Sequence, residues 1–328
     1  MTPENSKKEK FLALLVVIII FLFAGSILFS ISLNNKEKHL VYIQNKITRD
    51  LNHKIDIELN NIFFTSATSS AIEIATSSQI SSKSFLVLAV AINGNTKIIT
   101  QKQPEYVLPI ASITKLMDAV IMTENTDLNT KIKATKDYIG LEESAFILEP
   151  DKTYTVKNLI SNSLISSDND SARLLSSNLG EANFIKMMNS KAQELSMTNT
   201  KYVNVTGLDP QNINEGINVS TASDLAKLII YISKKHPEIL KITTNASYNF
   251  CDINNVCKII LSTNKILENK DFKYKIIGGK TGTTDLAGKN LILLTEITPN
   301  ISILSITLGS KDNFTDTLSL INNINIKN

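Results

Sequence analysis

Residues 11–33 constrain the fold of this chain more than any other part of its sequence. They are 23 largely apolar residues, and residues 11–35 carry no charge. A helix of this length, rising about 1.5 Å per residue, crosses a hydrocarbon core of about 30 Å. A cleaved signal peptide has a shorter apolar region and a small-x-small site, which residues 30–35 do not offer. We therefore expect a short tail over residues 1–10 and an uncleaved transmembrane signal anchor over residues 11–33.

Positive charge does not decide the orientation of this span. Three lysines lie within residues 7–10 before it, and three lysines and one arginine lie within residues 36–49 after it. A long folded domain crosses a membrane largely regardless of such charges. The side of the membrane on which the rest of the chain lies must therefore follow from its function.

Residues 34–84 indicate a stalk followed by a linker. Apolar residues recur there every three or four positions, as on one face of an amphipathic helix: Leu40, Ile43, Ile47, Leu51, Ile55, Leu59 and Ile62. Their average step is close to 3.6 residues, so a coiled-coil dimer is not favoured over packing on the membrane or on the body. Residues 65–84 are rich in Ser and Thr and form the expected linker.

Residues 85–328, called the body below, predict an α/β fold of the α+β kind. Asn93-Gly94 between two apolar runs is typical of a β-hairpin. Helical spacing marks residues 113–122, 156–165, 171–179, 183–195, 223–235 and 314–323, and β-rich runs lie at 258–261, 274–282, 290–297 and 301–309. Strands at both ends of the body predict one antiparallel sheet, flanked by helices, with an inserted helical subdomain.

The composition excludes several classes of protein. With 43% hydrophobic and 20% charged residues the chain can form a core, so wholesale disorder is excluded. A net charge of +3 is far from the basic excess that binds nucleic acid, so no nucleic-acid partner is expected. Three His and two Cys, without HExxH or CxxC, do not supply a zinc site. We expect neither a metal nor a cofactor.

Ser112 and Lys115 are a candidate nucleophile and base. A serine without a histidine base needs another amine, and a spacing of three residues puts hydroxyl and amine on one helix face. The pattern is weak alone, because Ser262 and Lys265 repeat it. Context favours the first pair, since Ser112 opens an apolar helix whereas Ser262 leads into a segment expected mostly at the surface.

Two more motifs follow in order. Ser167-Asp168-Asn169 begins 55 residues after Ser112, and Lys280-Thr281-Gly282 begins 168 residues after it. The first is weak singly, because SxN triplets also begin at Ser32, Ser176 and Ser262, and a helix cap explains it equally well. The second occurs once, after a strand-like run, where a glycine lets a ligand approach the backbone. The ordered set of all three is the signature of penicillin-binding proteins and class A β-lactamases.

The sequence around these motifs resembles the low-molecular-mass penicillin-binding proteins, the serine D-alanyl-D-alanine carboxypeptidases. PIASITKLMDAVI is similar to the family's nucleophile helix, YTVKNLISNSLISSDNDSARLL to its SxN segment and GGKTGTTDLAGKNLILL to its third motif. NFIKMMNSKAQELSMTNTKYVNVTGLD, STASDLAKL and STNKIL follow in the family's order. The resemblance covers about residues 85–325 and implies a β-lactamase/transpeptidase-like fold. Asp168 and Ser196 depart from it, since the family commonly has Gly at both positions.

The resemblance implies catalytic roles for four residues. Ser112 would attack the peptide carbonyl of an acyl-D-Ala-D-Ala stem, and Lys115 would take its proton. A neutral Lys115 requires a pKa far below the usual value of about 10.4, which burial and the like charge of Lys280 would favour. Ser167 would relay the proton to the leaving amine, and Asn169 would bind the substrate backbone and orient Lys115.

The third motif would bind the substrate. Lys280, as a charged ammonium, and Thr281 would hold the terminal carboxylate, and Gly282 would let the substrate lie close to the strand. The backbone N–H groups of Ser112 and Thr283 would face the oxyanion that develops during attack. Water would then release the acyl-enzyme.

The implied function is a membrane-anchored, penicillin-binding serine D-Ala-D-Ala carboxypeptidase of cell-wall metabolism. Its partners would be peptidoglycan stem peptides ending in D-Ala-D-Ala, β-lactams as inhibitors, and the membrane through the N-terminal helix. The substrate is assembled outside the cytoplasm, so we expect a single-pass protein of the bacterial cell membrane with an extracytoplasmic body. D,D-endopeptidase and transpeptidase activities use the same site and stay open.

Three other functions are less favoured. A β-lactamase needs a Glu and Asn pair after SDN, but no ExxxN occurs there, since Glu194 and Asn199 are five residues apart. A Ser-His-Asp hydrolase is disfavoured because His39 and His53 lie in the stalk, GxSxG is absent and His236 is expected at the surface. A catalytically idle peptidoglycan-binding protein is disfavoured by the intact motifs.

Cys251 and Cys257 flank the turn DINNV between two β-like runs. They form either a buried pair of thiols or a disulfide that closes a hairpin, and the compartment decides between them. An extracytoplasmic body favours the disulfide.

Overall fold

The computed structural model describes residues 44, 46–48, 80–92, 94–140, 148–212, 215–322 and 324. Residues 44 and 46–48 are helical and cover a small part of the expected stalk. The expected tail, membrane span and most of the stalk and linker lie outside the described residues. Within the described residues, no helix is both long and apolar enough to cross a membrane.

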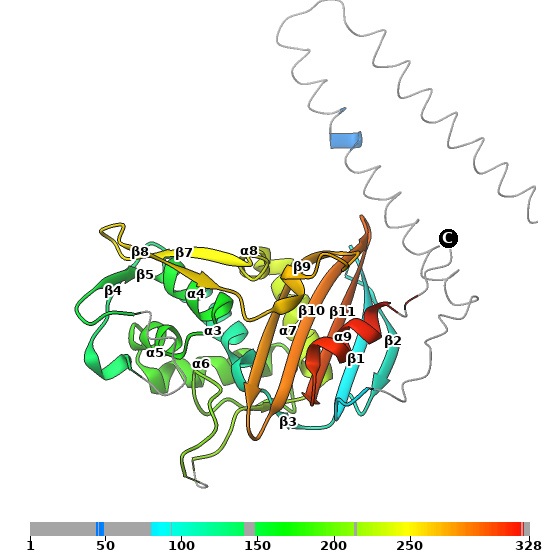
Figure 1. The fold of residues 1–328 in the computed structure, drawn as a ribbon, viewed down its shortest axis with the longest axis horizontal. Coiled ribbons are helices and arrows are strands. Elements are labelled where there is room, and N and C mark those ends of the chain that lie inside the picture. The colour runs from blue at the N-terminus through cyan, green and yellow to red at the C-terminus, as the bar shows by residue number, and fades with distance from the viewer. Residues whose placement is uncertain are drawn as a thin grey trace, which may run out of the picture. The chain divides into compact units, whose positions relative to one another are not determined.

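A five-stranded antiparallel sheet with the strand order β2-β1-β11-β10-β9 forms the centre of the body (Figure 1). Its first strand pairs with a strand from the far end of the chain: Ser84 of β1 lies opposite Leu308 of β11, and Ala91 lies opposite Ile301. This confirms the prediction of one sheet built from both ends of the body. The strands are β1 (Ser84–Ala91), β2 (Thr96–Lys102), β9 (Lys275–Thr284), β10 (Gly288–Thr298) and β11 (Ile301–Ser310).

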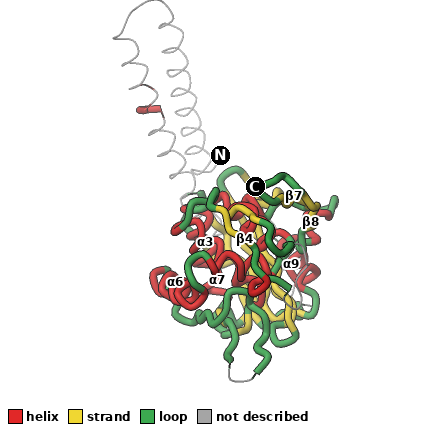
Figure 2. The backbone as a smooth tube through the Cα atoms, turned by 90° about the vertical axis from the view of Figure 1, so that its left-hand side faces the viewer, coloured by secondary structure: helices red, strands yellow, loops and turns green. Residues whose placement is uncertain are grey.

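The two faces of the sheet contribute to different apolar clusters. Phe85 and Val87 of β1 belong to a cluster with helix α9 (Asn313–Asn322). Leu86 and Leu88 point the other way, as alternation along a strand requires, and belong to the larger core with the remaining helices. In Figure 2, α9 lies on one side of the body and α6 and α7 lie on the other. The sheet is therefore flanked by helices as predicted.

The helical subdomain lies between β2 and β9 in the sequence, as predicted. Helix α3 is its most buried element, with eight consecutive buried residues from Lys115 to Met122. The helices are α3 (Lys115–Asn125), α4 (Val156–Ile165), α5 (Asn169–Ser177), α6 (Glu181–Glu194), α7 (Ala222–Lys235) and α8 (Pro237–Ile242). Short elements connect them: β3 (Leu108–Pro109), η2 (Ala111–Thr114), β4 (Lys131–Lys133), η3 (Lys136–Tyr138), β5 (Thr153–Thr155) and β6 (Val219–Ser220).

The two positions that depart from the family pattern have clear structural roles. Asp168 is the N-cap of α5, where its carboxylate accepts a hydrogen bond from the Ser171 amide at 2.7 Å. Side-chain caps of this kind stabilise helix starts. Ser196 follows α6 with a φ of 57°, in the left-handed region that glycine adopts more readily.

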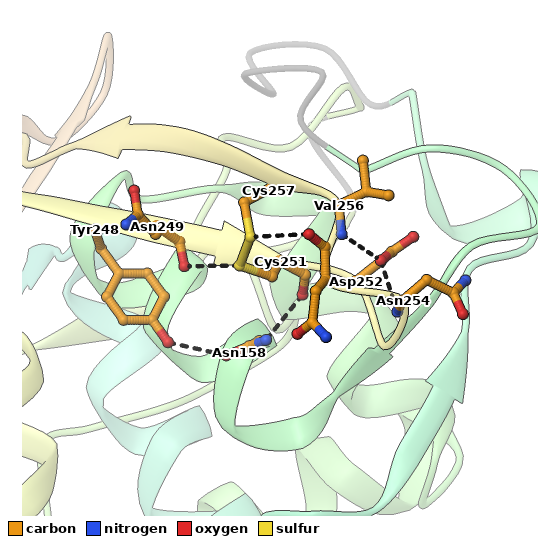
Figure 3. The surroundings of a disulfide bond; sticks show 9 residues. Asn158, Tyr248, Asn249, Cys251, Asp252, Asn254, Val256 and Cys257 are labelled. Atoms are coloured by element: carbon orange, nitrogen blue, oxygen red, sulfur yellow. Dashed lines mark hydrogen bonds between the residues drawn. A yellow bond between two sulfur atoms is a disulfide. The ribbon is translucent and has the colours of Figure 1, made fainter.

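A disulfide closes the hairpin of β7 (Ser247–Cys251) and β8 (Cys257–Leu261) (Figure 3). Cys251 and Cys257 lie directly opposite each other in this hairpin and are bonded. The Asn158 side chain on α4 donates to the Cys251 carbonyl at 2.8 Å, and Tyr248 donates to Asn158 at 2.9 Å. These contacts attach the hairpin to the helical subdomain.

Two local expectations can be compared with the structure. The segment that Ser262 leads into, residues 266–272, is mostly at the surface as expected: residues 268–271 are exposed, and Ile266 in η4 (Lys265–Glu268) is its one buried residue. His236, expected at the surface, is only 17% exposed in its side chain, and its Nε2 lies 3.0 Å from Glu124. This contact comes from a distant helix, so the local sequence pattern does not encode it.

Candidate active site

Ser112 and Lys115 lie where the 3-10 segment η2 passes into α3. The Lys115 amine and the Ser112 hydroxyl are 2.8 Å apart, so the spacing of three residues brings them into hydrogen-bonding contact. Ser112 is partly exposed, whereas Lys115 is completely buried. Ala111 precedes the serine with a φ of 48°, a left-handed conformation that costs energy for a residue with a side chain.

Two further oxygens accept hydrogen bonds from the Lys115 amine. It donates to the Asn169 side-chain oxygen at 2.8 Å and to the Thr206 carbonyl at 2.7 Å. Asn169 is the first residue of α5, directly after the capping Asp168. The helix start therefore aims the Asn169 amide at the amine that is also in contact with Ser112.

Lys280 on β9 approaches the same segment from the sheet. Its amine donates to the Ser167 hydroxyl at 2.8 Å and to the Thr281 carbonyl at 2.9 Å. Burial lowers the pKa of Lys280 well below its ordinary value, and the positive charge of Lys115 lowers it further. This differs from the expected assignment, in which Lys280 is the charged member of the pair.

Gly282 lets β9 lie directly against η2. A Cβ at this position would lie 2.7 Å from the Ile110 carbonyl oxygen and 3.1 Å from the backbone nitrogen of Ser112. A distance of 2.7 Å is shorter than the distances that real Cβ atoms keep from other heavy atoms. A side chain at this position would therefore push β9 away from Ser112. The glycine of the third motif is therefore required by the close approach of two backbones.

A cleft of about 350 Å³ opens over these residues. Six of the eight residues predicted for the site line it, and the other two, Lys115 and Lys280, lie buried with their amines against Ser112 and Ser167. The predicted lining residues are Ser112, Ser167, Asn169, Thr281, Gly282 and Thr283. Ser166, Leu208, Thr263, Thr284, Lys289, Asn313 and Phe314 complete the lining.

The loop that supplies the Thr206 carbonyl was not predicted from the sequence. Gly207 follows it with a φ of 80°, and a Cβ there would lie 2.0 Å from the Ala111 carbonyl oxygen. The buried Asn218 side chain donates to Thr114 at 2.9 Å and to the Asn204 carbonyl at 2.8 Å, which joins the loop to η2. The segment NVTGLD is part of the family resemblance and could have pointed to this loop. A contact made by a backbone carbonyl, however, requires no particular side chain and so produces no motif.

Hydrogen bonds of Asp209 and Thr263 connect segments that line the cleft. Asp209 accepts hydrogen bonds from the Thr284 hydroxyl at 2.7 Å and the Leu286 amide at 2.9 Å, so the loop is also joined to the turn after β9. The hydroxyls of Thr263 and Thr281 are 2.5 Å apart. The second SxxK pair has a different role, because the Ser262 hydroxyl accepts from the Asn264 amide in a turn.

The described residues contain no group of three or more His, Cys, Asp or Glu side chains placed to hold a metal ion. The polar side chains that line the cleft or lie buried beside it are instead hydroxyls, the amides of Asn169 and Asn313, and the amines of Lys115, Lys280 and Lys289. Such a set can activate a serine and bind a carboxylate.

Comparison with known proteins gives a consistent result. The sequence model described as D-alanyl-D-alanine carboxypeptidase matches residues 70–312. The chain is 31% identical over 218 residues to a D-alanyl-D-alanine endopeptidase of Pseudomonas aeruginosa, an alignment that covers 64% of this chain and 66% of that protein. It is 32% identical over 231 residues to a D-alanyl-D-alanine endopeptidase of Escherichia coli, covering 68% and 70%. The chain thus spans about two thirds of the length of these relatives.

A solved structure supports the same relationship. Penicillin-binding protein D2 of Listeria monocytogenes, determined with ampicillin bound, superimposes with a TM-score of 0.65 at 28% identity. The match covers 76% of this chain and 99% of that one. The antiparallel sheet and the helical subdomain described above are thus an arrangement that this protein shares.

Proposed function

Because the chain belongs to the D-alanyl-D-alanine carboxypeptidase family, we propose that it is a serine hydrolase that cleaves D-Ala-D-Ala bonds of peptidoglycan stem peptides. The observation that carries this proposal is the contact between the buried Lys115 amine and the partly exposed Ser112 hydroxyl at 2.8 Å. A nucleophile and base within hydrogen-bonding distance are the first requirement of covalent acyl transfer.

Acylation begins when Ser112 Oγ attacks the carbonyl carbon of the penultimate D-Ala. The Oγ–C bond forms as the hydroxyl proton passes to Lys115 Nζ, and the C–N bond then breaks as the amine leaves. Ser167 contacts Lys280 and lines the cleft, so it is placed to deliver a proton to that amine. Water then attacks the ester and releases the shortened peptide, which restores the Ser112 hydroxyl.

The two lysines act as one titrating pair. Two positive charges in a buried site are unfavourable, so the resting site holds one of the amines neutral. The lowered pKa of Lys280 indicates that it gives up its proton readily when no anion is near. A substrate carboxylate at Lys280 stabilises the charged form of that amine, so the neutral state passes to Lys115, which then takes the Ser112 proton.

The oxyanion that forms on the substrate carbonyl faces the backbone where β9 meets η2. We assign the N–H groups of Ser112 and Thr283 to this role. The closeness of Gly282 to Ser112 supports it, because one substrate oxygen can then reach both backbones. Thr281 and Lys280 hold the carboxylate at the same end of the cleft.

Membrane anchoring through residues 11–33 and an extracytoplasmic location of the body belong to this proposal. The support is the length of the uncharged apolar run and the location of the substrate. The disulfide between Cys251 and Cys257 also fits an oxidising compartment.

D,D-endopeptidase activity is the second candidate, since relatives at 31% and 32% identity carry that name. The two activities share the acyl-enzyme and differ in the leaving group, which is free D-Ala in one case and a second stem peptide in the other. Transpeptidase activity differs in using an amine in place of water.

The decisive experiment gives the full-length chain a diacyl-Lys-D-Ala-D-Ala peptide and, separately, a D,D-cross-linked muropeptide. Release of D-Ala supports the carboxypeptidase, and conversion of dimer to monomer supports the endopeptidase. Adding a competing amine detects transpeptidation as a new product. Ser112→Ala is the matched control, and turnover of either substrate by this variant contradicts the proposal.

A further inference from the structure

Asp118 is a buried acid one helical turn from Lys115 that the proposed mechanism does not use. A spacing of three residues puts both side chains on the same side of α3. Asp118 and Lys115 are each 0% exposed. Among the described residues, neither carboxylate oxygen of Asp118 has a hydrogen-bond partner. A buried carboxyl without such partners is costly, so its presence beside the base calls for an explanation.

A second polar group in this region also fails to stabilise the acid. The phenol of Tyr202, in the loop after α6, is buried and has no hydrogen-bond partner within the described part of the chain. Burial raises the pKa of Tyr202, and the negative charges of Asp118 and Asp224 raise it further. The phenol is thus close enough to sense the charge of Asp118, yet it donates no hydrogen bond to the carboxylate.

Lys115 is the charge to which Asp118 responds. Burial raises the pKa of Asp118 well above its ordinary value, which favours the neutral acid, and the positive charge of Lys115 opposes this rise. Asp118 therefore ionises more readily when Lys115 is charged. Asp168 at the N-cap of α5, Asp170 of α5 and Asp224 of α7 are other buried acids of the helical subdomain, and each accepts hydrogen bonds of its own. The titratable side chains of α4, α6 and α8, which pack against α3, are exposed or half-buried.

We propose that Asp118 is a positioning residue that acts through Lys115, because its buried carboxylate balances the positive charge that Lys115 acquires on taking the Ser112 proton. The inference rests on the function proposed above. Asp118 touches neither substrate nor reacting atoms. Its charge makes Lys115 a stronger base during attack, and it also makes Lys115 hold its proton to a higher pH in the resting protein.

The test compares the pH dependence of Ser112 acylation in the full-length wild type, Asp118→Asn and Tyr202→Phe. The probe is a fluorescent penicillin, and the measured quantity is the acylation rate from acidic to alkaline pH. Loss of the carboxylate should shift the acidic limb of the profile to lower pH by about one unit, the size of pKa change typical of losing a nearby opposite charge. The plateau rate of Asp118→Asn should fall a few-fold, because Lys115 becomes a weaker base.

Tyr202→Phe is the matched control, since it removes a second unpartnered buried group without changing a charge. Its acidic limb should coincide with that of the wild type. If Asp118→Asn does not fold, Asp118→Ser, whose new side chain is smaller and uncharged, repeats the test. The acidic limb of its profile should move in the same direction. Folding of each variant is verified by circular dichroism.

Two failures are distinguishable. If the wild type is not acylated at any pH, the proposed function itself is wrong. If the wild type is acylated and the folded Asp118 variants keep its acidic limb, or if Tyr202→Phe shifts the limb equally, Asp118 has only a structural role and this inference is overturned.

Discussion

The Lys280 amine donates a hydrogen bond to the Ser167 hydroxyl at 2.8 Å, although the two residues are 113 positions apart in the sequence. Two residues after Ser167, Asn169 accepts a hydrogen bond from Lys115. One short segment at the start of α5 therefore contacts both buried amines. A change in the protonation of either lysine alters the hydrogen bonds of this segment, so the roles of the two amines are separable only by substitution.

Lys115→Ala should abolish acylation of Ser112 by both peptide and penicillin. The serine loses the base that takes its proton, and such general-base catalysis contributes about 10²- to 10⁴-fold in rate. Rapid mixing with a labelled penicillin measures the rate, and mass spectrometry locates the adduct. Acylation at close to the wild-type rate would mean that another group is the base.

Lys280→Arg should have a milder effect, because it keeps a positive charge for the substrate carboxylate while changing its shape and donor geometry. We expect weaker turnover of carboxylate-bearing peptides with some activity retained. The acidic limb of the profile should change as well, since it reports the coupled lysine pair. An unchanged KM for the peptide would mean that Lys280 does not bind the substrate carboxylate.

Gly282→Ala should slow acylation and destabilise the body. Its Cβ would lie 2.7 Å from the Ile110 carbonyl oxygen, so β9 must move away from Ser112. Overpacking of this kind costs about 1 to 3 kcal/mol of unfolding free energy. Thermal unfolding measures the stability loss, and penicillin acylation below the melting temperature measures the rate. Wild-type values of both would contradict the close backbone contact.

Asp316→Asn should destabilise the body at neutral pH and have little effect in acid. Burial opposes ionisation of Asp316, but hydrogen bonds from Ser310, Ser82 and Ser81 outweigh it and lower the pKa. A lowered carboxyl pKa contributes stability above the unfolded value of about 3.9, and this stability is lost as the pH falls through the folded value.

Melting temperatures of wild type and Asp316→Asn at pH 7 and near pH 3 test this contrast. We expect a loss of about 1 to 3 kcal/mol at pH 7, the range for hydrogen bonds to a charged group. Asp271→Asn, at an exposed position, serves as the control and should change little at either pH. A pH-independent difference for Asp316→Asn would show that its charge is not the cause.

Reduction of the disulfide between Cys251 and Cys257 should lower stability by about 2 to 3 kcal/mol, as the chain-entropy account gives for a short loop. The double variant Cys251→Ser and Cys257→Ser should unfold at the temperature of the reduced wild type and show no further response to reductant. Acylation of Ser112 should persist at low temperature, since neither cysteine lines the cleft. Loss of acylation on reduction would place the hairpin among the elements that shape the site.

Protease added to intact spheroplasts should digest the body without lysis if residues 11–33 anchor it outside the cytoplasm. A cytoplasmic protein followed in the same sample verifies that the membrane stays closed. Digestion only after lysis would place the body inside the cell and exclude peptidoglycan as its substrate.

The fold was largely predictable because its periodic patterns are local. The helical spacing of residues 156–165 matches α4 residue for residue, and the Asn93-Gly94 signal lies between the paired strands β1 and β2. The meeting of the first and last strands followed from their places at the two ends of the body. The disulfide stayed open, because the sequence shows two cysteines on either side of a turn but not the compartment that decides whether they are oxidised.

The parts of the site that side chains form were predictable from the sequence, whereas the parts that backbone groups form were not. Ser112, Lys115 and Lys280 form recognisable motifs, whereas the Thr206 carbonyl that holds Lys115 has no signature in its side chain. The charge assignment of the lysine pair also differed, because burial lowers the pKa of Lys280, which was expected to be the charged member. Asp118 escaped notice because an acid inside an apolar helix matches no motif until its surroundings are known.

The pairing of Ser84 with Leu308 sets the order in which this protein can be made. The central sheet lacks its middle strand until more than two hundred residues after β1 have been synthesised. Contacts between such distant segments form late, since a long loop must close before they contribute. A nascent chain held at its N-terminus by residues 11–33 would therefore wait, with its first hairpin unsupported, for its own far end to arrive. A chain that ends before β11 cannot assemble this sheet, and the active site that β9 completes cannot form on it.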